Sequence, residues 1–465
     1  MRLMNVRFRI VILLLAGCVF ACATPRLAAQ ATADSITNDF QSYFTSLNNA
    51  YKFLDFMMDA YQQGSTPRLI QSYGDAPGFC SCTAFTYDND VAVMAYLARG
   101  TSDDLARAQV IGNAILFVQQ HDPYHDGRVR EAYWPTSIAA PNGVDPSIGG
   151  LFFLPDSRTG EQAWTGMALA QLYVRTHNSD YLNGAAALGA WIVNNTFDTR
   201  GAGGYNSGKD TNNSPAPYMF KSTENNIDAY ALFVMLDQLH ASTGTLTQPW
   251  SYYASHAIAF LQAMWNPTSN TTGFFWTGTD NSGVTPNTSI IPEDVQTWSF
   301  LALHDRRFAS SVDWALKNLA TTDTSSSTNN GLSQYGTNIS ISGLSFDTFA
   351  LSGQRTVTWD PRLPDPNSVW LEGTAHTADA LLFRGVFDFF TAAKLLGNIE
   401  KSQQLIAAAE QVNGQAIPVG LGIAAATSTQ DTGFFFDYFQ DLHIGATAWY
   451  LTAGQFANPF RLGLR

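Results

Sequence analysis

The chain has 465 residues, of which 45% are hydrophobic, 13% aromatic and only 14% charged, with a formal net charge of −13. A soluble domain ordinarily carries about a quarter charged residues, and this composition excludes a disordered chain, a coiled coil and a collagen-like fibre. No basic cluster accompanies the acidic balance, so we expect no nucleic-acid partner, because phosphate is bound by Lys and Arg.

The N-terminus reads as a signal peptide. Residues 1–9 carry three arginines and no acid, and the apolar run that follows, Ile10 to Ala16, is too short to span a bilayer. Leu15-Ala16-Gly17-Cys18 resembles the lipobox of bacterial lipoproteins, in which Cys18 would become the lipidated first residue. The alternative is ordinary cleavage after Ala23 or near Ala31, where small residues also gather.

Two cysteines, Cys80 and Cys82, follow the signal peptide. Export permits a disulfide, but a bridge across one residue closes a strained ring. A local disulfide and two free thiols are therefore both possible for this pair. No second Cys pair completes a zinc site, and Asp280-Asn281-Ser282-Gly283 lacks the spaced acids of a calcium loop. We therefore expect neither a metal nor a cofactor.

Six apolar helical segments have a similar composition. They combine small residues with Leu, Met and aromatic residues, and nearly all of their charged residues lie in the first turn. They recur with a period of about 70 residues, which indicates a repetitive fold. Helices that are apolar on most faces are buried, so we expect these six to lie inside the protein. They cover residues 86–98, 159–173, 222–236, 292–304, 371–383 and 443–454.

Longer amphipathic segments alternate with the apolar ones. In the segment 103–120, apolar residues such as Leu105, Ala108, Ile111 and Ile115 recur at steps of three and four, which is typical of a helix with one buried face. The amphipathic segments cover residues 36–62, 103–120, 179–195, 250–265, 307–320 and 399–412.

Six buried helices alternating with six amphipathic ones can form an inner ring inside an outer ring. This pattern resembles the (α/α)6 toroid of the six-hairpin glycosidases. The resemblance implies an all-α fold with one toroid domain at 36–460, after a signal peptide at 1–23 and a linker at 24–35, with short β-hairpins in loops such as Gly273–Thr277. An open α-solenoid is the alternative, although solenoids usually have shorter units and need polar caps.

The repeat places an acidic residue at the start of five of the six apolar helices, and a histidine in the sixth. In a toroid the N-termini of the inner helices open on one end, so these groups would line one funnel. Any single acid in a first helical turn also stabilises the helix dipole by about 0.3–1 kcal/mol without a catalytic role. The six residues are Asp88, Glu161, Glu224, Asp294, Glu372 and His443.

Glycoside hydrolysis needs two carboxyl groups, one as a general acid with a raised pKa and one that activates water. We expect Glu224 to be the acid, with Asp228 one helical turn on to orient a substrate hydroxyl or to help set the pKa of the acid. We expect Glu372 to be the base. The other catalytic candidates are Glu161, Asp294 and Asp88.

Residues near these acids are the candidates for sugar binding, because sugar faces stack on aromatic rings and sugar hydroxyls need polar partners. The candidates are Asn225, Asp228, Trp164, Trp298, Trp370, His376, His443 and Tyr133. The resemblance thus implies an exported, monomeric glycoside hydrolase that cleaves a neutral poly- or oligosaccharide by inversion. Its location would be the periplasm or the cell envelope, as a lipoprotein anchored through Cys18, or otherwise outside the cell.

Three other functions stay open. A sugar epimerase shares this toroid and uses paired histidines, for which His376 and His443 are candidates. A polysaccharide lyase needs a base and cations that neutralise a uronate carboxylate. The lyase candidates are Tyr124, His125 and Tyr133 as base, and Arg128, Arg130 and Lys221 as cations. A non-catalytic glycan-binding lipoprotein would keep the aromatic residues without needing paired acids.

Overall fold

The computed structural model describes residues 26–75, 83–135, 152–154, 156–210, 216–326, 332–358, 361–405 and 410–464. It divides into two compact units, Met1–Asn48 and Asn49–Arg465, and the larger unit carries the fold considered below. The predicted signal peptide with Cys18, as well as Cys80 and Cys82, lies outside the described residues. Of the helices described, none is both long and apolar enough to cross a membrane.

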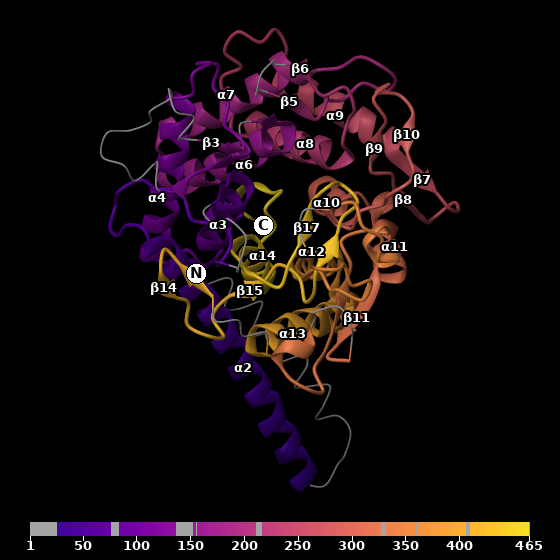
Figure 1. Cartoon of the computed structure of the whole chain (residues 1–465). Coiled ribbons are helices and arrows are strands. Elements are labelled where there is room, and N and C mark those ends of the chain that lie inside the picture. Colours follow the sequence, from indigo (N-terminus) through magenta and orange to yellow (C-terminus); the bar gives the residue numbers. More distant parts are fainter. Residues whose placement is uncertain are drawn as a thin grey trace. The chain divides into compact units, whose positions relative to one another are not determined.

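A closed ring of six helices forms the inside of the larger unit (Figure 1). Each of them contacts the next along the chain, and the last contacts the first. This closure confirms the predicted (α/α)6 toroid and excludes the open solenoid. The inner helices are α3 (Thr86–Arg99), α6 (Thr159–Thr176), α8 (Thr223–Gln238), α10 (Asp294–Leu303), α12 (Leu371–Arg384) and α14 (Ile444–Gly454).

Outer helices pack against the inner ones. Each of the five that follow an inner helix packs on it as an antiparallel hairpin. They are α4 (Ser102–Gln120), α7 (Ser179–Thr196), α9 (Trp250–Met264), α11 (Ser310–Asn318) and α13 (Phe389–Leu405). Helix α2 (Arg26–Asp59) begins within the segment predicted as a linker, and its last turns contact α3, where the Tyr51 hydroxyl donates to the Ala95 carbonyl over 2.9 Å.

The predicted outer helix at 399–412 is wrong in its bounds. Helix α13 begins ten residues earlier, at Phe389, and ends at Leu405, because Ala392, Leu395 and Leu396 already belong to its buried face. Short 3-10 helices complete the helical elements. They are η2 (Arg306–Phe308), η3 (Leu332–Tyr335), η4 (Ala350–Ser352), η5 (Val386–Asp388) and η6 (Leu462–Leu464).

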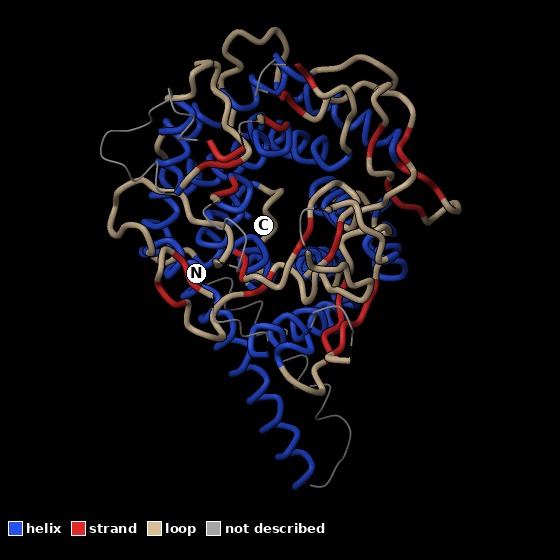
Figure 2. The backbone as a smooth tube through the Cα atoms, in the orientation of Figure 1, coloured by secondary structure: helices blue, strands red, loops and turns tan. Residues whose placement is uncertain are grey.

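The strands are short and lie in the loops, in antiparallel pairs or three-stranded sheets (Figure 2). The predicted hairpin at Gly273–Thr277 is present as β8 paired with β7. The strands are β1 (Ala84–Phe85), β2 (Ala132–Tyr133), β3 (Phe152–Leu154), β4 (Ser157–Arg158), β5 (Gly208–Asp210), β6 (Ala216–Pro217), β7 (Trp265–Pro267), β8 (Gly273–Phe275), β9 (Gly278–Thr279), β10 (Pro286–Asn287), β11 (Ala320–Thr324), β12 (Ser340–Leu344), β13 (Gln411–Val412), β14 (Gln415–Ala416), β15 (Ile423–Ala424), β16 (Gln430–Asp431), β17 (Asp437–Tyr438) and β18 (Leu442–His443).

A buried side chain near the start of each inner helix clamps the loop that leads into that helix. On α10, the Gln296 side chain accepts a hydrogen bond from the Phe275 N–H and donates one to the Phe275 carbonyl, both over 2.9 Å. On α12 and α14 the clamp is a threonine, whose hydroxyl accepts a hydrogen bond from the loop N–H but makes none to the carbonyl of the same residue. The other clamps are Asn89 on Ile70, Gln162 on Val129, Asn226 on Tyr205, Thr374 on Leu344 and Thr447 on Ile423.

The first residue of three inner helices adds a second contact. The hydroxyls of Thr86, Thr159 and Thr223 each donate to a loop carbonyl over 2.6 Å. Buried backbone groups need hydrogen-bond partners, and these side chains supply them where no neighbouring strand does. The clamps thereby fix the first turn of each inner helix, where the predicted acids lie.

Replacing a clamp should destabilise the whole ring. In Gln296→Met the side chain keeps its length but leaves the N–H and the carbonyl of Phe275 buried and without that partner. Each unsatisfied group costs about 1–3 kcal/mol, so we expect the free energy of unfolding to fall by at least about 2 kcal/mol. Urea unfolding followed by tryptophan fluorescence measures this, with Gln404→Met on the exposed face of α13 as the control. An equal effect of both substitutions would contradict the role of the clamp.

Candidate active site

The five predicted acids lie in the first turns of five consecutive inner helices, at the same end of the ring. Asp88, Asp294 and Glu372 are buried, whereas Glu161 and Glu224 are partly accessible. Electrostatic coupling links them: Glu161 and Glu372 both raise the pKa of Glu224, and Glu224 raises that of Asp294. The structure therefore brings the acids together.

Glu372 on α12 is held as a carboxylate. The Tyr87 hydroxyl donates to its Oε1 over 2.7 Å, His376 Nε2 lies 3.6 Å from the same oxygen, and His443 Nδ1 lies 3.5 Å from Oε2. Burial, the largest single influence, would raise the pKa of Glu372, but these three neighbours together hold it below its ordinary value.

His376 lies between two glutamates. Its Nδ1 is 3.2 Å from Glu293 Oε2, on the side opposite Glu372, and the Thr377 hydroxyl donates to the other oxygen of Glu293. Burial would lower the pKa of His376, but the two carboxylates raise it to about 9. At neutral pH this residue is therefore an imidazolium that holds negative charge on Glu372.

Asp88 and His443 form a second buried pair, 3.0 Å apart between Oδ2 and Nε2. Burial would lower the pKa of His443, but the carboxylates of Asp88 and Glu372 raise it despite burial, while the Tyr73 ring stacks on the imidazole at 4.2 Å. Gly445 permits the close packing here, because a Cβ at that position would lie 2.6 Å from Asp88 and 3.1 Å from Glu372.

Glu224 and Glu161 form the part of the site with raised pKa values. Burial is the main cause for both, and the neighbouring carboxylates add to it. Together they raise the pKa of Glu224 to about 7 and that of Glu161 to about 8. A charge on either one disfavours a charge on the other. At neutral pH the pair therefore retains a proton, as a general acid requires.

Arg158 at the rim of this pair is already paired with acids. Its guanidinium lies 3.2 Å from Asp156 and 3.6 Å from Glu131 and stacks on the Tyr218 ring at 4.2 Å. This cluster bounds the site on the α6 side.

Aromatic residues form the layer beneath the acids. Trp164, Trp298 and Trp449 pack against one another with ring centroids 5.2–5.9 Å apart, and Trp449 Nε1 donates to the Tyr87 hydroxyl over 2.7 Å. The predicted sugar-binding residues Trp164, Trp298 and Trp370 are almost fully buried. In this conformation they support the site and offer no open ring face.

Two other predicted residues have different surroundings. Asn225 stands beside Glu224 and is partly accessible. Tyr133, on β2, is fully buried, and its hydroxyl accepts from the Arg130 N–H over 2.8 Å. Tyr133 therefore holds the backbone of the loop that precedes α6.

The sequence analysis missed Glu293, Tyr87, Tyr73 and Tyr438. Glu293 directly precedes Asp294, and Tyr87 directly precedes Asp88. The alignment of the repeats selected one acidic residue for each helix and did not consider the residue before it. Tyr73 belongs to a loop and Tyr438 to the short strand β17, and the helical repeat determines the position of neither. Among the described residues, no group of three His, Cys, Asp or Glu side chains could hold a metal ion.

The cations considered for a lyase are all paired with acids. Arg128 lies 2.6 Å from Asp126, and Arg130 lies 2.5 Å from Asp122. Lys221 is fully buried.

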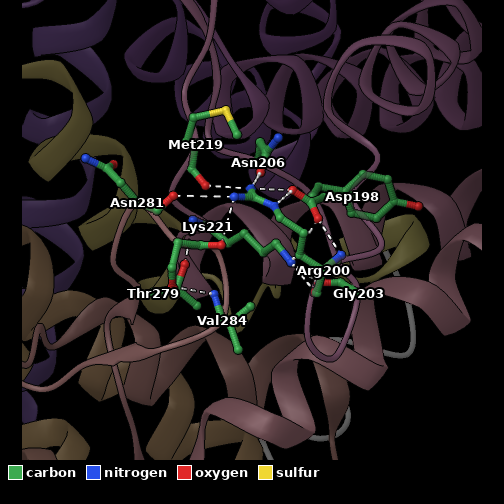
Figure 3. A network of polar contacts seen from close by, with 12 residues as sticks. Asp198, Arg200, Gly203, Asn206, Met219, Lys221, Thr279, Asn281 and Val284 are labelled. Atoms are coloured by element: carbon green, nitrogen blue, oxygen red, sulfur yellow. Dashed lines mark hydrogen bonds and ion pairs between the residues drawn. The ribbon is translucent and has the colours of Figure 1, made fainter.

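Lys221 belongs to a network that holds the loop before Glu224 (Figure 3). Its Nζ donates to the carbonyls of Arg200 and Gly203 over 2.7 and 2.8 Å and lies 3.4 Å from Asp198. Its backbone N–H donates to the Thr279 hydroxyl over 3.1 Å. Lys221 is therefore a structural residue that positions the start of α8.

No family model matches the sequence, and no curated protein matches it. Solved structures do match. A family 76 glycoside hydrolase from a bovine Bacteroides thetaiotaomicron strain has a TM-score of 0.52 at 12% identity, over 88% of this chain and 76% of that one. A family 76 mannosidase from Bacteroides thetaiotaomicron VPI-5482 has a TM-score of 0.51 at 10% identity, over 88% of this chain and 98% of that one.

A D-mannose isomerase has a TM-score of 0.55 at 10% identity, over 88% of this chain and 96% of that one. A glycosidase variant in complex with glucose has a TM-score of 0.54 at 10% identity, over 90% of this chain and 98% of that one. At this identity the similarities concern the fold alone. They confirm, at that level, the predicted (α/α)6 toroid.

Burial of Asp228 should lower the stability of the folded protein. Asp228 lies one turn below Glu224 and is fully buried, where the Trp164 side chain is a weak donor that only partly offsets the effect of burial. Burial first, and then Glu224 and Asp294, raise its pKa well above the ordinary value. The unfolded chain loses this proton near pH 4 whereas the folded protein keeps it, so the group lowers stability as pH rises above that value.

Asp228→Asn removes this titration with little change of shape. We expect the unfolding temperature of the variant to exceed that of the wild type at pH 7–8, and the difference to shrink as pH falls toward 4. Differential scanning calorimetry across this pH range measures it. A gain that is the same at every pH, or a loss at pH 7, would contradict the raised pKa.

Proposed function

We propose that the protein is a glycoside hydrolase that cleaves a neutral manno- or gluco-configured poly- or oligosaccharide. The observation that carries the proposal is the contrast between Glu224, whose pKa is raised to about 7, and Glu372, whose pKa is lowered, in one cluster. A glycosidase needs such an acid and such a base. The mannosidase and the glucose-bound glycosidase of similar fold support the substrate class.

The reaction follows from these charge states. Glu224 donates its proton to the glycosidic oxygen as the bond to the anomeric carbon breaks. Glu372 takes a proton from a water molecule, whose oxygen bonds to the anomeric carbon from the opposite face, with inversion. Glu224 ends ionised and Glu372 protonated, and proton exchange with solvent restores both. His376 and Tyr87 stabilise the ionised form of Glu372.

A sugar isomerase or epimerase is the second candidate. His376 and His443 both lie in the acid cluster, and a D-mannose isomerase has this fold. A histidine that removes a proton from carbon must be neutral, however, and the pKa of His376 is raised to about 9. Interconversion of mannose, fructose and glucose, followed by proton NMR, tests this candidate directly.

The remaining alternatives have less support. A lyase would need free cations, whereas Arg128, Arg130 and Lys221 are all paired with acids. A purely glycan-binding protein would need no cluster of buried acids.

We also propose that the chain is exported and acts as a monomer. Mass spectrometry of the mature N-terminus distinguishes lipidation of Cys18 from cleavage after Ala23 or near Ala31, and Cys18→Ser should abolish lipidation alone. Light scattering of the purified protein tests the monomer.

Substitution of the two glutamates should separate their roles. Glu224→Gln should lower kcat/KM on a mannan or glucan by about 10²–10⁴-fold, but much less on an aryl glycoside with a nitrophenolate leaving group, which needs no proton. Glu372→Gln should lose activity on both substrates. Release of reducing sugar and of nitrophenolate measures these rates, and NMR of the first-formed anomer tests inversion.

The outcomes are distinct. If Glu224→Gln lowers kcat/KM equally on both substrates, Glu224 is not the general acid. Undiminished activity of Glu372→Gln would remove it as the base. An unsaturated product absorbing near 235 nm would indicate a lyase.

The pH profile provides a further test. Since Glu224 must be protonated and Glu372 ionised, kcat/KM should fall above about pH 7, and should fall on the acid side only below the ordinary pKa of a glutamate, 4.5. Glu161 helps to raise the pKa of Glu224, so Glu161→Gln should move the alkaline limb to lower pH.

The control is Asp103→Asn, which changes an acid that is 69% exposed on the outer helix α4. It should leave the pH profile in place. An alkaline limb that does not move in Glu161→Gln would show that the two glutamates are not coupled.

A further inference from the structure

Three consecutive phenylalanines form the exposed tip of the hairpin β16–β17. Phe434, Phe435 and Phe436 are 37%, 77% and 41% exposed, and Phe435 has a left-handed φ of 68°. Adjacent exposed rings are costly in water and usually mark a binding surface. The sequence analysis did not identify this tip.

The base of the hairpin is held firmly. Asp431 accepts hydrogen bonds from the backbone N–H groups of Val357 and Gly433 over 3.0 and 2.8 Å. Gln430 accepts from the Phe346 N–H over 3.0 Å and donates to the Ser368 carbonyl over 2.9 Å. The rings are therefore exposed on a fixed support.

A continuous path of rings leads from this tip to the acid cluster. Phe346 contacts Phe434 at 6.5 Å, Phe436 at 6.0 Å and Trp370 at 4.7 Å between ring centroids. Trp370 in turn contacts His376 at 5.1 Å and lies two residues before Glu372 in the chain.

Tyr438, on the same hairpin, also faces the acids. It contacts Phe436 at 5.5 Å, and after burial the main influence that raises its pKa is Glu372, with Asp294 and Asp88 contributing. The Tyr438 ring also contacts Trp370, the residue before α12, at 5.4 Å between ring centroids. Ring contacts thus connect the tip with the proposed active site.

We propose that the phenylalanine tip, Phe434–Phe436, is a sugar-binding subsite that stacks a pyranose ring of the substrate remote from the cleaved bond. This inference rests on the proposed function. The apolar face of a pyranose covers an aromatic ring, and a fixed ring loses little entropy when it binds. Continuity with the acids points to a saccharide chain, so the enzyme favours oligosaccharides over disaccharides.

The test is the dependence of kcat/KM on chain length, from disaccharide to hexasaccharide, with both gluco- and manno-oligosaccharides. The wild type should cleave longer chains more efficiently. Phe435→Ala should lower kcat/KM for the hexasaccharide about tenfold, which corresponds to burial of one phenylalanine face, and leave the shortest cleaved substrate nearly unchanged. Phe434→Ala should act in the same direction.

The matched control is Phe387→Ala, which removes a ring that is 96% exposed on η5, beyond the C-terminal end of α12. It should leave the length dependence intact. An unchanged length dependence in both tip variants, or an equal effect of all three substitutions, would overturn the subsite.

Binding of the same hexasaccharides, measured by isothermal titration calorimetry, separates this inference from the proposed function. If no oligosaccharide is cleaved but the wild type binds one about ten times more tightly than Phe435→Ala, the subsite stands and the hydrolase fails. If Glu372→Gln is inactive while Phe435→Ala binds and cleaves as the wild type does, the hydrolase stands and the subsite fails. Absence of any binding would overturn the subsite.

Discussion

The structure depends on a hydrogen-bonded clamp repeated around the ring. A buried amide or hydroxyl near the start of each inner helix binds the backbone of the loop leading into it, as Gln296 does with Phe275. The backbone N–H and carbonyl groups of a loop cannot be buried without partners. The clamps supply such a partner in all six repeats, and so fix the six helix starts at one end of the ring.

Fixed helix starts allow charge to be concentrated where burial makes it costly. Glu372 remains ionised in the buried cluster because His376, His443 and Tyr87 surround it, whereas Glu224 and Glu161 lie near one another and retain a proton. Similar carboxyl groups thus acquire opposite charge states from burial and from their different neighbours. Groups perturbed in this way gather at functional sites more often than elsewhere.

The aromatic richness of the chain has two structural causes. Trp164, Trp298 and Trp449 form a buried layer that supports the acids, while the rings of Phe434–Phe436 stand exposed on a hairpin. The sequence analysis placed Trp164 and Trp298 among the candidates for sugar binding and did not identify the phenylalanines. A tryptophan on an inner helix packs into the ring, and the position of an aromatic residue in a loop is known only once the loop is folded.

The sequence by itself determined the period, the apolar inner helices and the acid at the start of five of them, because these follow from helical periodicity and local spacing. It also singled out Glu224 and Glu372. Only the tertiary structure decided which groups touch them. The contacts of Glu293 with His376 and of Tyr87 with Glu372 join residues more than 80 positions apart, and the charge states depend on these contacts. Spacing along a chain cannot specify such contacts, since they arise only when the ring closes.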